Sequence, residues 1–238
     1  MKARLVGASL LAAILVAIAL VSSRTGGDIG ATSADAFAAG FVARSANNRP
    51  PETTAAGAYS IDPVHTTIAF SARHLVINDV PGRFREFAGT IQYDPDDPAK
   101  SSVTFKAKAA SLDTGVEQRD NHLRSADFFD VANYPEITFK STRIEKKAQN
   151  DYIANGDFTL RGVTKQLALP FKLYGTVKDP WGKIRLGVEA GTTINRQDYG
   201  VKWNQVLDGG GLAVSNEVKI RLLVEAVKQE PAPPQPAK

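Results

Sequence analysis

Residues 87–109 read FAGTIQYDPDDPAKSSVTFKAKA, and this stretch decides the fold class. Apolar and polar side chains alternate through residues 87–93 and again through residues 103–109, which is the pattern of half-buried β-strands. Between them, residues 94–98 are a run of aspartate and proline typical of a turn. The stretch therefore predicts two neighbouring strands that pair antiparallel through a short connection.

The same alternation recurs between residues 59 and 228 and predicts eight strands in all. Because closure removes the exposed edges of a sheet, we expect an all-β, eight-stranded antiparallel barrel similar to the lipocalins. A barrel of this size is either filled by its own side chains or holds one small ligand, and alternation does not distinguish the two. The predicted strands centre on residues 68–74, 87–93, 103–109, 137–139, 158–160, 167–173, 184–190 and 218–224.

Two connections are longer than turns. Residues 115–130 have helical periodicity and predict a short helical cap, with Asp120 paired to Arg124 at a spacing of i, i+4. Residues 195–215 are rich in glycine and contain aromatic residues, which indicates a loop.

The ends of the chain differ in composition from the predicted barrel domain, residues 59–228. Residues 1–23 combine two early basic residues with an apolar run, which predicts a signal peptide for export to the periplasm. An uncleaved inner-membrane anchor remains the alternative, since the run is almost long enough to span a bilayer. Residues 24–58 are expected to be a flexible linker, and residues 229–238 a proline-rich tail.

Composition excludes several functional classes. The 238 residues include no cysteine, so disulfides, cysteine-ligated metal sites and cysteine nucleophiles are ruled out. The net charge is only +4 and its signs interleave along the chain, so nucleic acid is not an expected partner. The three histidines lack metal-binding spacing, and no serine-hydrolase motif is present, so we expect neither a metal site nor a catalytic residue.

Several segments together resemble the YceI-like, polyisoprenoid-binding family of exported bacterial proteins. The resemblance covers nearly all of residues 59–227 and implies a lipocalin-like barrel that sequesters a long isoprenoid or quinone-like lipid without catalysing a reaction. It needs no other cofactor. Inner-membrane proteins and a homodimer are further expected partners. The segments that carry the resemblance are YSIDPVHTTIAFSARHL (59–75), GRFREFAGTIQYD (82–94), SLDTGVEQRDNHLRSADFFDVANYPEITFKS (111–141), GDFTLRGVTKQLALP (156–170) and residues 179–220.

The candidate ligand-binding residues form two groups. Polar residues suited to a lipid headgroup at the barrel mouth are His74, Arg119, His122 and Arg124. Apolar residues expected to contact the lipid are Ile68, Phe70, Phe87, Ile91, Phe105, Phe139, Phe158, Leu169, Phe171, Leu186, Trp203 and Ile220.

Two other functions remain open at this point. The first is an enzyme or accessory factor acting on a lipid or quinone headgroup, with His74 or His122 as the base. The second is a filled barrel that binds a membrane partner through the loop at residues 195–215. A continuous apolar tunnel inside the barrel would favour the lipid carrier over both.

Overall fold

The computed structural model describes residues 55–230. The predicted signal peptide or anchor, nearly all of the predicted linker and most of the proline-rich tail lie outside the described residues. One sheet of eleven strands dominates the described part of the chain. The strands are β1 (Gly57–Ile61), β2 (Thr67–His74), β3 (Asn78–Phe84), β4 (Phe87–Tyr93), β5 (Ser102–Lys108), β6 (Leu112–Asp113), β7 (Glu136–Lys146), β8 (Asp151–Leu160), β9 (Val163–Lys178), β10 (Ile184–Asn195) and β11 (Val214–Lys228). The helices are α1 (Glu117–Arg124) and the 3₁₀ turns η2 (Pro98–Lys100), η3 (Ala109–Ser111) and η4 (Arg196–Tyr199).

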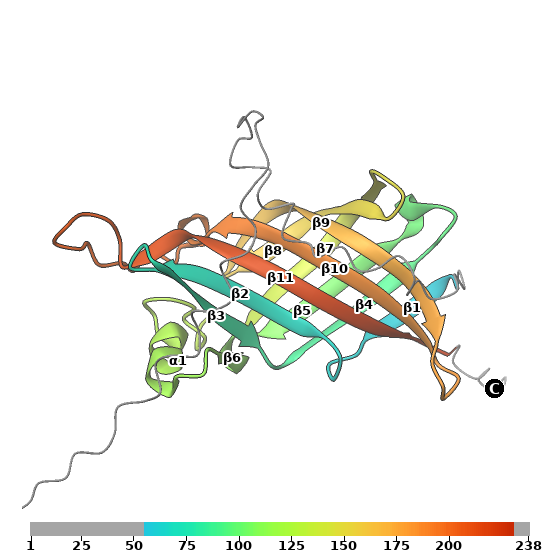
Figure 1. Ribbon diagram of the computed structural model, residues 1–238, viewed down its shortest axis with the longest axis horizontal. Helices are drawn as coiled ribbons and strands as arrows, with labels where there is room; N and C mark the ends of the chain where they lie inside the picture. Colours follow the sequence, from blue (N-terminus) through green and yellow to red (C-terminus); the bar gives the residue numbers. More distant parts are fainter. Residues whose placement is uncertain (1–54, 231–238) are drawn as a thin grey trace, which may run out of the picture. The chain divides into compact units, whose positions relative to one another are not determined.

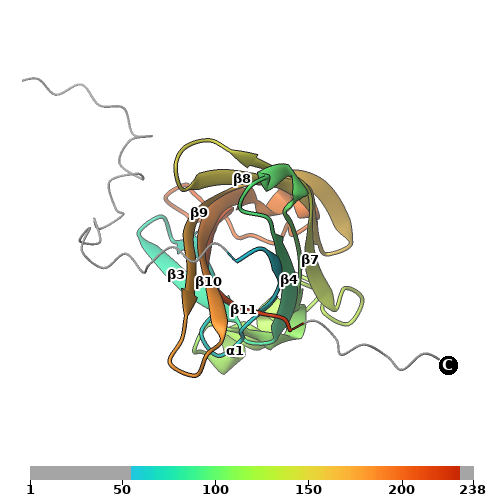
Figure 2. The same ribbon diagram turned by 90° about the vertical axis from the view of Figure 1, so that its right-hand side faces the viewer.

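Eight of these strands close into a barrel. Strands β1, β4, β5, β7, β8, β9, β10 and β11 follow one another around the sheet, and pairing of β1 with β11 closes the ring. Each strand pairs antiparallel with its neighbours, from β1–β4 round to β10–β11. Figure 1 shows the barrel from the side, and Figure 2 shows it along its length. The all-β, eight-stranded antiparallel barrel with a short helical cap predicted from sequence is confirmed.

The three remaining strands extend members of this ring. Strand β11 pairs with β1 near its end, at Ala226–Lys228, and with β2 along Val214–Leu223. Strands β1 and β2 therefore lie end to end along β11, and residues 62–66 separate them. In the same way β3 continues β4, and β6 continues β5.

The sequence predicts β2 but not β1, β3 or β6. Strand β3 contains Pro81 and Gly82, which interrupt a strand pattern, and β6 has only two residues. These segments are strands because neighbouring strands pair with them, and their own sequence shows little sign of a strand.

The helical cap is shorter than predicted, and one predicted contact within it is wrong. Helix α1 spans Glu117–Arg124, and tight turns follow as far as residue 133. Asp120 does not pair with Arg124, because it accepts hydrogen bonds from the amide and hydroxyl of Thr114. Arg124 instead reaches out of the helix to backbone carbonyls at Ala110 and Leu112, 2.9 and 2.7 Å away.

The barrel has two distinct ends (Figure 1). At one end, called the cap end, lie α1, the β2–β3 turn and the loop between η4 and β11. At the other, called the turn end, lie the β4–β5, β7–β8 and β9–β10 turns, the start of β1 and the end of β11. Among residues 55–230, no helix has the length and apolar character needed to cross a bilayer.

Candidate ligand-binding cavity

The barrel encloses an elongated apolar cavity of about 260 Å³. Its volume lies just below the range of roughly 300–1,000 Å³ for small-molecule pockets. On β11, Val214 and every second residue from Val218 to Val224 line it, because side chains of a strand point inward at every second position. At about 3.3 Å per residue, this lined stretch runs for roughly 33 Å along the strand.

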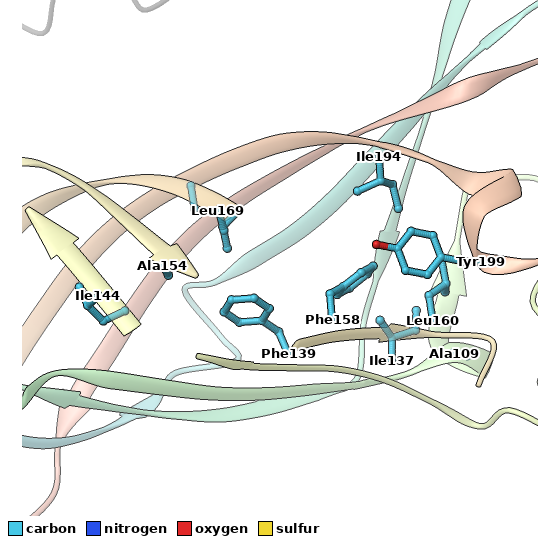
Figure 3. Packing of buried hydrophobic residues seen from close by; sticks show 11 residues of the cluster. Ala109, Ile137, Phe139, Ile144, Ala154, Phe158, Leu160, Leu169, Ile194 and Tyr199 are labelled. Atoms are coloured by element: carbon cyan, nitrogen blue, oxygen red, sulfur yellow. The ribbon is translucent and has the colours of Figure 1, made fainter. Parts of the chain in front are cut away.

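Side chains from several strands meet along this interior (Figure 3). Ile144, Ala154 and Leu169 lie toward the turn end, and Phe139 lies between them and the cap end. Toward the cap end, the ring of Phe158 meets Tyr199 edge to face, with ring centroids 5.4 Å apart. The wall is therefore hydrocarbon for most of its length.

A glycine lets the ring of Phe70 lie close to the neighbouring strand. A Cβ atom at Gly82 on the neighbouring strand β3 would overlap the ring of Phe70. The ring also packs against Phe84 and Phe129, with centroids 5.4 and 6.4 Å away. Gly82 thus permits a close approach that leaves the interior unobstructed.

Ten of the candidate residues from the sequence line the cavity. They come from eight strands, and alternation places each of them inward. These residues are Ile68, Phe70, Ile91, Phe105, Phe139, Phe158, Leu169, Phe171, Leu186 and Ile220.

The other six candidates are not among the lining residues. Phe87 packs behind Phe105, with ring centroids 6.2 Å apart. His74 is exposed at the last position of β2, beyond the lined part of that strand. The remaining four, Arg119, His122, Arg124 and Trp203, belong to the cap end.

The two cap arginines hold the backbone of the cap. Arg119 donates from Nη2 to the carbonyl of Thr114 at 2.8 Å and from Nε to its hydroxyl at 2.7 Å. Arg124 donates to the two carbonyls described above and to the side-chain oxygen of Asn121 at 3.0 Å. These contacts use the guanidinium groups for local structure, and neither arginine is among the lining residues.

His122 and Trp203 join the two segments of the cap. The imidazole meets the rings of Phe128 and Trp203 edge to face, with centroids 5.0 and 5.1 Å away. Phe128 is the member of this cluster that lines the cavity. Nε2 of His122 lies 2.9 Å from a carboxylate oxygen of Asp127, on the exposed side. Through Phe128 the cluster packs against the cap end of the cavity.

Arg196 is a cavity-lining residue that the sequence analysis did not select. It is only 4% exposed, and burial lowers its pKa from the usual arginine value. Its Nε donates to the carbonyl of Ser215 at 2.9 Å, and Nη1 donates to those of Val201 and Trp203 at 2.9 and 2.8 Å. The alternation that places Ile194 inward, two residues earlier, also places Arg196 inward, but an arginine is seldom assigned to a core face.

Polar residues reach the cavity at the turn end. The lining there includes Gln92 of β4, Ser102 of β5, and Asp94 and Ser101 of the connection between these strands. Asp94 accepts hydrogen bonds from the amides of the β4–β5 turn, which fixes its carboxylate. Among the described residues, this end of the lining contains no cationic side chain.

A second polar cluster lies at the interruption between β1 and β2. Asp62, His65 and Glu225 place possible ligand atoms within 4.8 Å of one another. Arg185 already donates from Nη1 to Asp62 and Glu225 at 2.9 and 2.5 Å, so its charge stands where a bound cation would lie. The hydrogen bond from His65, supported by that from Arg185, lowers the pKa of Asp62 to about 2.

Comparison with known proteins places this barrel in a family. A UPF0312 protein of Shewanella sp. strain ANA-3 is 39% identical over 181 residues, which cover 75% of this chain and 92% of the relative. The crystal structure of the Campylobacter jejuni YCEI protein matches with a TM-score of 0.57 and 28% identity, over 66% of this chain and 90% of that one.

A polyisoprenoid-binding domain from Saccharophagus degradans, implicated in plant cell wall breakdown, has the same fold at a TM-score of 0.53. It is 16% identical, and the match covers 72% of this chain and 98% of that domain. The family model for the YceI-like domain matches residues 59–226. The chain therefore belongs to the YceI-like family.

Proposed function

We propose that this protein is a non-enzymatic carrier that holds a polyisoprenoid or another long-chain amphiphile inside its barrel. The elongated apolar cavity is the observation that carries this proposal. The likeness to a solved polyisoprenoid-binding domain supports the same ligand class.

The energetics of burial suit such a ligand. Each CH₂ group moved from water into an apolar wall contributes about 0.8 kcal/mol, so a chain of a few isoprene units offsets its ordering cost and binds at micromolar concentration or below. The long lined stretch of β11 accommodates an extended chain better than a compact ring system.

The charges of the lining favour an uncharged headgroup. Arg196, the cation among the described lining residues, is occupied by backbone carbonyls, and Asp94 places a carboxylate at the turn end. A phosphate or carboxylate head would meet a like charge there without a compensating cation. A hydroxyl or quinone-like carbonyl would find polar partners in Ser101 and Ser102.

The two alternatives lack support from the geometry. Neither His74 nor His122 is among the described lining residues, so neither is placed to act on a bound headgroup. A filled structural barrel is inconsistent with the cavity. Export to the periplasm by residues 1–23 completes the proposal, since a carrier there would meet lipids that leave a membrane.

Extraction of lipid from the full-length protein, purified from its own host, tests the proposal. Mass spectrometry of the organic extract is expected to show a stoichiometric neutral isoprenoid or long-chain amphiphile. Stripped protein is expected to take up farnesol, an uncharged isoprenoid alcohol, more tightly than farnesyl phosphate. Repeated preparations without lipid, together with no uptake of either probe, would overturn the proposal.

A further inference from the structure

Trp181 stands out on the surface at the turn end. It occupies the tip of the β9–β10 hairpin and is 81% exposed, although tryptophan offers more apolar area than almost any other side chain. In the described part of the chain no ring packs against it.

The turn beneath Trp181 is held rigid. One carboxylate oxygen of Asp179 accepts the amides of Trp181 and Lys183 at 3.0 and 2.9 Å, and the other accepts Nε of Arg185 at 2.7 Å. Gly182 adopts a φ of 89°, which a side chain would disfavour, and its amide bonds back to the carbonyl of Asp179. The indole is thus presented outward by a preorganised turn, which reduces the entropy lost when it binds a surface.

The charge at this tip is positive. Lys178 and Lys183 flank the turn, both are exposed, and neither forms an ion pair with another described residue. The carboxylate of Asp179 is paired with Arg185, which also pairs with Asp62 and Glu225, and its side chain is only 6% exposed. Two free ammonium groups therefore accompany the exposed indole.

The geometry points to the Trp181 hairpin tip as the part of the barrel that docks on the surface of an anionic lipid bilayer. Tryptophan and lysine are suited to this surface, because the indole lies at the headgroup level and the ammonium groups attract anionic lipids. The exposed indole with a lysine on each side is local to this turn, whereas the β2–β3 turn at the cap end exposes the aliphatic residues Val76 and Ile77.

The path of the chain agrees with this orientation. Strand β1 begins at the turn end, so the linker that leads back to the apolar run of residues 5–21 joins the barrel on the same side as Trp181. The polar part of the cavity lining also reaches this end. The role of this docking rests on the proposed function: with the turn end on the bilayer, a lipid could pass between bilayer and cavity without crossing water.

Tryptophan fluorescence tests the docking directly, because the chain has only two tryptophans, Trp181 and Trp203. In the full chain, Trp203→Phe leaves Trp181 as the reporter and keeps a ring in the cap. The matched variant Trp181→Phe leaves Trp203, at the opposite end. With vesicles of phosphatidylcholine and brominated phosphatidylglycerol, we expect quenching of Trp181 and none of Trp203, whether or not residues 1–23 remain attached.

The lysines supply a second test. Lys178→Gln and Lys183→Gln are each expected to weaken binding to these vesicles roughly fivefold, since one basic residue near an anionic surface contributes that much. Lys202→Gln, which removes an exposed lysine at the cap end, is the control and is expected to leave binding unchanged.

Quenching of Trp203 in place of Trp181 overturns the docking proposal. Quenching of neither tryptophan also overturns it, and is the result expected if the hairpin tip binds a protein and not a bilayer. Uptake of farnesol by the same variants is measured separately. Loss of uptake with Trp181 still quenched would count against the carrier function alone, and retained uptake without quenching would count against docking alone.

Discussion

The imidazole of His122 meets the indole of Trp203 edge to face, with ring centroids 5.1 Å apart and ring planes at 85°. This contact joins helix α1 to the loop between η4 and β11, two segments that are far apart in the sequence. It gives two candidate ligand-binding residues a structural role: both pack against Phe128, which lines the cavity, and neither lines the cavity itself.

We expect the loss of this contact to speed ligand release. In His122→Ala two aromatic contacts disappear, each worth about 0.5–1.5 kcal/mol, so the cap should open roughly tenfold more often. His122→Phe keeps the ring and is the matched control. Stopped-flow release of farnesol checks the prediction, and equal loss of function in both variants would instead indicate chemistry by the imidazole.

Arg196 is expected to be essential for stability. In Arg196→Met the carbonyls of Ser215, Val201 and Trp203 lose a charged donor in a buried place, which should lower the free energy of unfolding by about 3–5 kcal/mol. Arg196→Lys supplies fewer donors and should fall between the two. Urea denaturation measures all three proteins, and a loss below about 1 kcal/mol would contradict the role given to Arg196.

Filling the cavity should abolish binding without unfolding the barrel. Ala154 is buried and lines the cavity, so Ala154→Phe places a ring in the path of a lipid chain. Ala88→Phe adds the same ring on the exposed side of β4 and is the control. Farnesol uptake should disappear only in the first variant, while the melting temperature of both stays close to that of the wild type. Unchanged uptake by Ala154→Phe would mean that the ligand binds elsewhere.

Uptake should also depend on chain length. Each added CH₂ that reaches the wall is expected to raise affinity roughly fourfold, until the chain fills the lined stretch. A series of isoprenoid alcohols of increasing length, measured by competition with farnesol, would show the plateau. Affinity that is independent of length would argue against an elongated site.

Asp62 should make the protein sensitive to acid. Its pKa in the folded protein is about 2, below the ordinary 3.8, because His65 and Arg185 bond to the carboxylate. The stabilisation is therefore complete above about pH 4 and is lost as the pH falls through about 2. The difference in urea midpoint between wild type and Asp62→Asn is expected to shrink over this window. A difference that stays constant from pH 7 to pH 2 would contradict the assignment.

The alternation of residues carried most of the information about the barrel wall. It predicted β2, β4, β5 and the later strands, and it placed residues such as Phe139 and Ile220 on the face that lines the cavity. Charged and aromatic residues of the connections were harder to place. Arg119 and Arg124 point to carbonyls that are close only after the chain has folded.

The sequence alone determined that this chain forms an eight-stranded barrel and which residues face inward, because a period of two is a local property of each strand. Only the tertiary structure decided whether the interior is filled, since that depends on how side chains from opposite strands meet across the barrel. It also decided that Gly82 makes room for Phe70, that Arg196 is buried at the cap end, and that Trp181 stands free at the other. Each of these depends on which residues, distant in the sequence, the closed sheet brings close together.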